Sequence, residues 1–297
     1  MRIVRRSTLV FTAALAVILG GGLAVIGAKA TPVGAWLGLA APAVIAWVSL
    51  RRPLRRWRVA HRPMPPGARE WLARHVPLYA VLEDEARERF ERDVRFVLDE
   101  WTFEPVADAD VRPEHRLGVA AGAALLLHGR PDWELPARHT VLFYPGSFDE
   151  DYLPTDRATF DGMAHEQGPV IVAVDAVEAS WADPTDGSNV VLHELAHLLD
   201  YLNSAADGVP ALLDPASLDA WQRLVRREIQ AARLGKSLLR RYAGTNAAEF
   251  FAVAVENFFE RPDLLRRRHA ELYEALVAFF ALDPDVRKGE ASMADGE

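Results

Sequence analysis

The sequence predicts a mainly helical α+β domain with a small sheet, preceded by an N-terminal hairpin of two transmembrane helices. Three observations lead to this prediction. Two long apolar runs flanked by arginines fill most of the first 62 residues. Several later segments carry apolar residues at helical spacing, and two short runs rich in β-branched residues are typical of strands. We expect the hairpin over residues 1–62, the folded domain over 63–285 and a disordered tail over 286–297.

The N-terminal segment carries the signals of membrane insertion. Residues 8–27 are uncharged and would form a helix about 30 Å long, the thickness of a bilayer core. Residues 33–50 form a second apolar run, at the lower limit of spanning length. Arginines precede the first run and follow the second, so both ends are expected in the cytoplasm. The sequence therefore predicts an inner-membrane protein whose folded domain faces the cytoplasm, with cleavage of a signal peptide near Ala28-Lys29-Ala30 as the alternative.

Composition narrows the function classes. The chain has no cysteine, which excludes disulfides and thiolate metal sites. Residues 1–62 hold ten Lys or Arg and no Asp or Glu, which leaves 24 basic and 42 acidic residues beyond them, a balance of −18. An acidic domain lacks the basic surface that nucleic-acid binding requires, so we expect no direct nucleic-acid partner.

The expected elements follow from periodicity. Helices are predicted where apolar residues recur every three or four positions, strands where short apolar runs are bounded by turn residues, and a loop where the sequence is polar. The predicted helices are 83–100, 114–127, 189–200, 217–233, 247–260 and 264–282, the predicted strands are 139–144 and 169–174, and the loop is 145–168.

One predicted helix, 189–200, carries the pattern H-E-x-x-H at His193, Glu194 and His197. The two histidines lie one turn apart on the same face, so both imidazoles reach a single ion. Zinc accepts imidazole ligands and keeps an open position for water in catalytic sites, and Glu194 is placed to take a proton from that water. In a shuffled chain the pattern would arise roughly 0.02 times. The alternative is a buried helix whose histidines are only hydrogen-bonded.

A catalytic zinc site needs a third protein ligand. Glu249 and Glu256 lie seven residues apart on one face of the predicted helix 247–260. A carboxylate on an apolar face requires a cation or a hydrogen-bond network. Periodicity leaves the choice between the two open. Asp200 lies on the same face as the histidines, where it either orients an imidazole or ends the helix in water.

Two stretches resemble the Mlc titration factor A family of zinc-dependent peptidases, whose site is similar to that of anthrax lethal factor. They are the run HELAHLLD from His193 and the run YAGTNAAEFFAV from Tyr242. The resemblance extends more weakly to VLFYP at 141–145 and GPVIV at 168–172, and covers roughly residues 68–284.

This resemblance implies a zincin-like metallopeptidase domain. It implies that His193, His197 and Glu249 bind Zn²⁺, that Glu194 is the general base, and that Tyr242 stabilises the tetrahedral oxyanion. It also implies that an edge strand holds the peptide substrate in extended form, and residues 169–174 are the matching run.

Two functions from different classes fit these features. The first is a zinc peptidase anchored at the membrane that hydrolyses peptide bonds in a peptide or protein substrate. The second is a non-catalytic binding module that sequesters a transcriptional regulator at the membrane, and the family's name indicates a repressor similar to Mlc as that partner. A pseudoenzyme is expected to lose Glu194 or a ligand, and the sequence keeps all of them, which favours the enzyme.

Overall fold

The computed structural model describes residues 1–3, 6–30, 34–136, 138–149, 160–165, 168–201 and 215–285. The chain divides into two compact units, Met1–Pro63 and Met64–Glu297. The predicted tail, 286–297, lies outside the described residues. In chain order the elements are α1 (Arg6–Ala30), α2 (Gly34–Ala60), α3 (Ala68–His75), α4 (Pro77–Ala80), α5 (Asp84–Glu100), β1 (Thr102–Pro105), α6 (Pro113–Leu127), β2 (Thr140–Tyr144), β3 (Gly162–Ala164), β4 (Val170–Ala173), α7 (Val174–Ala182), α8 (Val190–Asp200), η2 (Pro215–Ser217), α9 (Leu218–Arg233), η3 (Arg241–Gly244), α10 (Ala247–Glu260), α11 (Pro262–Arg268) and α12 (Ala270–Phe280).

The N-terminal unit consists of α1 and α2, which pack against each other. Within the described part of the chain, no helix combines the length and the apolar character needed to cross a bilayer. Alanine and glycine make up much of α1, and the second half of α2 is rich in arginine and contains Pro53. Charged side chains at the centre of a membrane helix cost about 2.5–3.5 kcal/mol each. The predicted transmembrane hairpin is therefore wrong, and so is the inner-membrane location that rested on it.

The second unit contains a four-stranded mixed sheet in the order β1-β2-β4-β3. β1, β2 and β4 run parallel, and β3 pairs antiparallel with β4, with Gly162 opposite Val172. All four residues of β4 are buried, as expected for an inner strand of a parallel sheet. The prediction that residues 169–174 form the edge strand is wrong, because β3 covers that edge. The sequence missed β1, and it missed β3 inside the predicted loop.

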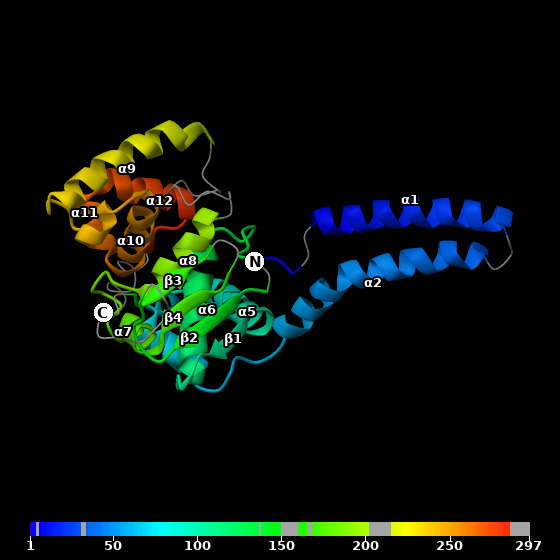
Figure 1. The fold of residues 1–297 in the computed structure, drawn as a ribbon, viewed down its shortest axis with the longest axis horizontal. Coiled ribbons are helices and arrows are strands. Elements are labelled where there is room, and N and C mark those ends of the chain that lie inside the picture. Colours follow the sequence, from blue (N-terminus) through cyan, green and yellow to red (C-terminus); the bar gives the residue numbers. More distant parts are fainter. Residues whose placement is uncertain are drawn as a thin grey trace. The chain divides into compact units, whose positions relative to one another are not determined.

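α8 lies between the sheet and the C-terminal helices. Figure 1 shows α9 to α12 gathered on one side of α8 and the sheet on the other, and α8 contacts both β3 and α10. α6 also packs closely on α8, because Gly122 has no side chain: a Cβ at Gly122 would lie 2.7 Å from Cγ1 of Val191. These contacts fix α8 on three sides.

The C-terminal helices differ in one respect from the prediction. Residues 264–282 were expected to form one helix, but α11 ends at Arg268 and α12 begins at Ala270. His269 leaves the helical conformation there, with φ −140° and ψ 57°, and its Nε2 accepts a hydrogen bond from the backbone N–H of Leu238 at 3.1 Å. Its Nδ1 contacts Oε2 of Glu228 on α9 at 2.7 Å. The residue at the break between α11 and α12 thus contacts α9. The predicted mainly helical α+β architecture with a small sheet is confirmed.

Candidate metal centre

The two histidines of the H-E-x-x-H pattern face each other in the structure. Asn189 directly precedes α8, and its side chain accepts a hydrogen bond from the backbone N–H of Leu192 at 3.0 Å and so caps the helix. One turn of helix separates the imidazoles, and Nε2 of His193 lies 3.3 Å from Nε2 of His197. Both side chains are buried.

α10 brings a carboxylate to the same point. Asn246 caps the start of this helix, where its side chain accepts a hydrogen bond from the backbone N–H of Glu249 at 2.9 Å. Oε2 of Glu249 lies 3.0 Å from Nε2 of His193 and 3.7 Å from Nε2 of His197. The three donor atoms all lie within 4.8 Å of one another.

Glu256, the other candidate, contacts the opposite side of the same imidazole. Its Oε1 lies 2.7 Å from Nδ1 of His193, and its Oε2 accepts a hydrogen bond from the backbone N–H of Asn189 at 2.7 Å. The Glu256 side chain is completely buried. It therefore cannot share the position of Glu249, but it can set the orientation and the tautomer of His193.

Arg240 holds Glu256 in place and was not found from the sequence. Its guanidinium donates to both carboxylate oxygens, from Nη1 to Oε2 at 2.7 Å and from Nη2 to Oε1 at 2.8 Å. A bidentate pair of this kind fixes both partners. The only sequence signal that could have pointed to this contact is the buried carboxylate itself, because the arginine lies 16 residues away in a region without periodicity.

The donor set fits a divalent cation. A divalent cation would accept the lone pairs of both Nε2 atoms, which lie 3.3 Å apart. Burial disfavours a charged His193, but its hydrogen bonds to Glu249 and Glu256 outweigh this and raise its pKa to about 10. Burial likewise opposes ionisation of Glu249, yet its contacts with both imidazoles lower its pKa. The surroundings thus favour positive charge at this point, as a proton or as a metal ion.

Glu194 lies beside this cluster under the edge strand. It is 5 % exposed, and burial raises its pKa. A Cβ atom on Gly162 of β3 would lie 2.6 Å from Oε1 of Glu194. The edge strand therefore passes directly over the Glu194 carboxylate, and only a glycine at position 162 leaves room for that carboxylate.

Tyr242 approaches the cluster from η3, immediately before α10. Its ring centroid lies 5.9 Å from that of His193, and the side chain is 44 % exposed. Burial of the hydroxyl, with the neighbouring Glu249 carboxylate, raises the pKa of Tyr242 to about 12. The phenol is therefore a hydrogen-bond donor at neutral pH.

Asp200 does not orient either imidazole, which was one of the two roles that the sequence suggested for it. It ends α8 in a fully buried position. Among the described residues, no hydrogen bond joins Asp200 to either imidazole, and the carboxylate that contacts His193 on its Nδ1 side is Glu256.

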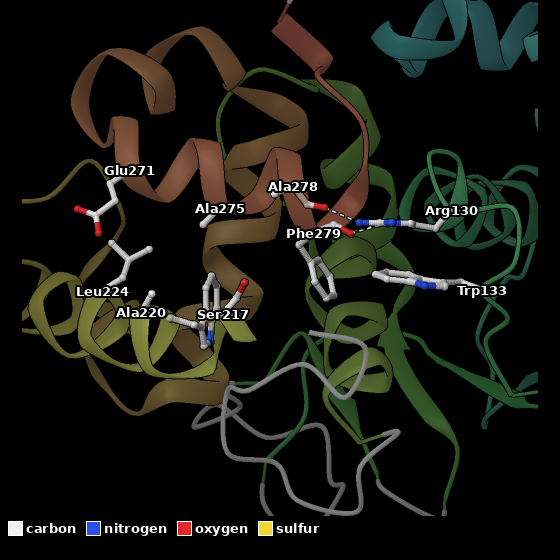
Figure 2. A pocket seen from close by; sticks show the side chains of 10 residues that line it. Arg130, Trp133, Ser217, Ala220, Leu224, Glu271, Ala275, Ala278 and Phe279 are labelled. Atoms are coloured by element: carbon white, nitrogen blue, oxygen red, sulfur yellow. Dashed lines mark hydrogen bonds between the residues drawn. The ribbon is translucent and has the colours of Figure 1, made fainter. Parts of the chain in front are cut away.

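A separate cavity of about 490 Å³ lies between α9, α12 and the segment after α6 (Figure 2). Arg130 forms one wall, where its guanidinium stacks 5.4 Å from the Trp133 ring and donates to the backbone carbonyls of Ala278 and Phe279. None of the predicted site residues lines it. The metal centre is therefore defined by its converging donor atoms and not by this cavity.

Comparison with known proteins agrees with this geometry. The model of the family described as glucose-regulated metallo-peptidase M90 matches residues 51–281. An uncharacterized protein of Synechocystis sp. is 30 % identical over 244 residues, covering 77 % of this chain and 89 % of that protein. Mlc titration factor A of Yersinia enterocolitica is 29 % identical over 252 residues, covering 78 % and 91 %. Mlc titration factor A of Yersinia pestis is 29 % identical over 265 residues, covering 80 % and 94 %.

These matches confirm the resemblance drawn from the HELAHLLD and YAGTNAAEFFAV runs. The matches to the relatives span most of this chain and most of each relative. The family model covers both the helix that carries His193 and the helix that carries Glu249. The chain belongs to the M90 family of glucose-regulated metallo-peptidases.

Proposed function

We propose that the chain is a zinc-dependent peptidase whose catalytic domain covers residues 63–285. In this proposal His193, His197 and Glu249 hold the metal, and Glu194 is the general base. The observation that carries it is the convergence of one carboxylate and two imidazole donors within 4.8 Å, next to a buried glutamate that bonds to none of them.

Zinc is the metal that this donor set favours. Two imidazole nitrogens and one carboxylate oxygen are a common protein set for catalytic zinc, and three protein ligands leave one position open. When bound, the metal supplies a Lewis acid that polarises the scissile carbonyl and makes water a better nucleophile at neutral pH.

Glu194 handles the proton of the attacking water. Its raised pKa makes the carboxylate a stronger base than an exposed glutamate. It is therefore suited to accept a proton as water attacks the peptide carbonyl and to return it to the leaving amine nitrogen.

Tyr242 supplies a hydrogen bond to the developing oxyanion. It keeps its proton at neutral pH because its pKa is about 12. Its ring lies beside His193 and is partly exposed, so the hydroxyl can approach a bound substrate. A donor aimed at charge that develops in the transition state lowers the barrier.

A regulatory partner is a second proposal. Family membership implies a peptide or protein substrate, and two relatives carry the name Mlc titration factor A. We propose that a transcriptional repressor similar to Mlc binds this chain as well. A purely non-catalytic binding module is the alternative, and it predicts full partner binding with no peptide hydrolysis.

Metal analysis of the full-length chain tests the main proposal. We expect about one zinc per chain after purification without chelator, hydrolysis of peptides, loss of that hydrolysis with a chelator and recovery with added zinc. A zinc content far below one per chain, or hydrolysis that survives complete metal removal, would rule out the proposed site.

A further inference from the structure

The cavity of about 490 Å³ between α9, α12 and the segment after α6 has a buried floor and an open mouth (Figure 2). Trp221 and Phe279 line it and are only 4 % and 5 % exposed, so they form the floor. Ala220 and Ala278 also line it and are exposed. Their side chains are short, so the mouth is wide enough for a small molecule to enter.

The floor belongs to a continuous row of aromatic rings. The Trp133 ring centroid lies 4.8 Å from that of Phe279, the Phe279 centroid 5.8 Å from that of Phe251, and the Phe251 centroid 6.1 Å from that of Trp221. Phe251 is completely buried in α10 and holds the two rings on either side of it. The aromatic wall is therefore formed before any ligand binds, as is usual for small-molecule sites. Flat aromatic groups gain more on such a wall than their buried area alone provides.

One end of the cavity carries a fixed cation. Nε of Arg130 donates to the backbone carbonyl of Phe279 at 2.9 Å, and Nη2 donates to that of Ala278. The guanidinium also stacks 5.4 Å from the Trp133 ring. These contacts hold the group in place, while Nη1 makes no hydrogen bond with any described residue. A guanidinium that is already oriented and has donors left is suited to bind a carboxylate.

The opposite end carries a carboxylate whose charge is already offset. Figure 2 shows Glu271 at the far end of the cavity from Arg130. Oε2 of Glu271 accepts a hydrogen bond from Nη2 of Arg227 at 2.9 Å, and the Glu271 side chain is 63 % exposed. A paired carboxylate in contact with water attracts a cation only weakly. The charges that line the cavity therefore favour an anion at Arg130 over a cation at Glu271.

The volume limits the size of the ligand. An apolar cavity of roughly 150 Å³ holds one benzene molecule, so 490 Å³ has room for two or three fused rings. We propose that this cavity binds a small aromatic carboxylic acid, with its rings against Trp221 and Phe279 and its carboxylate on Nη1 of Arg130. The site goes beyond the proposed peptidase function and does not involve the metal.

Calorimetry on the metal-free, full-length chain tests this inference with naphthalene-2-carboxylate as the probe. The metal is removed because a carboxylate could otherwise bind zinc. We expect one molecule per chain with a dissociation constant below about 1 mM, and the same affinity in the zinc-loaded chain. Naphthalene-2-carboxamide has the same shape without the charge and should bind about tenfold more weakly, because it lacks a charged hydrogen bond. Octanoate keeps the charge without the rings and should bind at least about threefold more weakly.

Two variants locate the bound probe. Ala275 lines the cavity from α12 and is half-buried, so Ala275→Phe should fill the space and abolish binding. Ala86→Phe is the matched control, since Ala86 is a half-buried helical alanine on α5 that does not line the cavity, and it should bind the probe like the parent. Arg130→Gln should lower the affinity for the carboxylate to that for the carboxamide. Circular dichroism verifies the fold of each variant.

The opposite results would overturn the inference. Binding that occurs only in the zinc-loaded chain would place the acid at the metal centre. Binding that survives Ala275→Phe would place it outside this cavity. Equal affinities for the carboxylate and the carboxamide, or tighter binding of cationic 2-naphthylmethylamine, would contradict the role of Arg130. None of these measurements depends on peptide hydrolysis, so this inference and the proposed function can fail separately.

Discussion

Oε1 of Glu256 lies 2.7 Å from Nδ1 of His193, while Nε2 of the same imidazole faces Glu249. One histidine is thus held between two carboxylates, one on each ring nitrogen. The bond on the Nδ1 side keeps the proton there and leaves the Nε2 lone pair for a metal. Because Arg240 binds both oxygens of Glu256, that orientation does not depend on solvent.

Removal of Glu249 should loosen the metal. Glu249→Ala deletes one of three proposed ligands, and we expect zinc content well below one per chain after dialysis, whereas the parent protein retains it. Zinc is measured on folded protein, verified by circular dichroism. The ligand assignment is wrong if Glu249→Ala keeps full zinc while Glu256→Ala loses it.

Substitution of Glu256 should weaken zinc binding less than removal of Glu249 does. Glu256→Gln places an amide among the donors of Arg240 and Asn189, so the support of His193 is weakened but no ligand is lost. We expect zinc affinity to fall about 10–100-fold, measured by competition with a chelator. Glu228→Gln, another buried glutamate that contacts a histidine, is the control and should bind zinc like the parent. Equal affinities for all three proteins would contradict an orienting role for Glu256.

Glu194→Gln should separate binding from catalysis. The amide keeps the shape of the side chain but cannot accept a proton, and Glu194 is not a proposed ligand. We expect nearly stoichiometric zinc with peptide hydrolysis lowered 10² to 10⁴-fold, about 3–5 kcal/mol in activation free energy. Hydrolysis at the parent rate would refute the peptidase mechanism.

Tyr242→Phe should lower peptide hydrolysis less than Glu194→Gln does. It removes only the hydroxyl proposed to bind the oxyanion, so zinc should remain and kcat should fall roughly 10 to 10³-fold. Because this hydrogen bond forms in the transition state, KM should change little. A rise in KM at constant kcat would place Tyr242 in substrate binding instead.

The contact between Glu228 and His269 predicts a pH dependence of stability. The hydrogen bond from His269 outweighs the opposing effect of burial and lowers the pKa of Glu228 below its unfolded value of 4.5. Its stabilisation is therefore fully present above about pH 4.5 and is lost as the pH falls through the folded pKa.

Urea unfolding of metal-free parent and Glu228→Gln proteins measures this contribution. The difference in unfolding free energy between them should shrink as the pH is lowered from about 6 to 3. Glu274→Gln, which removes an exposed carboxylate from the adjoining helix, should differ little from the parent throughout. A difference that grows on acidification would contradict the sign of the shift.

The sequence by itself determined the features that depend on near neighbours. Helical spacing placed His193 and His197 on one face of α8, and the distances confirm that they meet. The same reasoning found α10 and its two glutamates on one face, but seven residues bring a helix back to nearly the same direction, so periodicity could not assign them. Only the packing of α10 on α8 directs Glu249 to Nε2 and Glu256 to Nδ1 of His193.

Strand order and the N-terminal helices show the same difference between what the sequence determines and what the tertiary structure decides. β4 was recognised by its β-branched residues, but its place inside the sheet depends on β3, a three-residue strand at Gly162–Ala164 without a β-branched residue. The apolar runs of the first 62 residues predicted helices correctly and a membrane hairpin incorrectly. Local pattern determines which residues form a helix or a strand, whereas the partner that each element meets depends on contacts between residues far apart in the chain, and only the tertiary structure decides these.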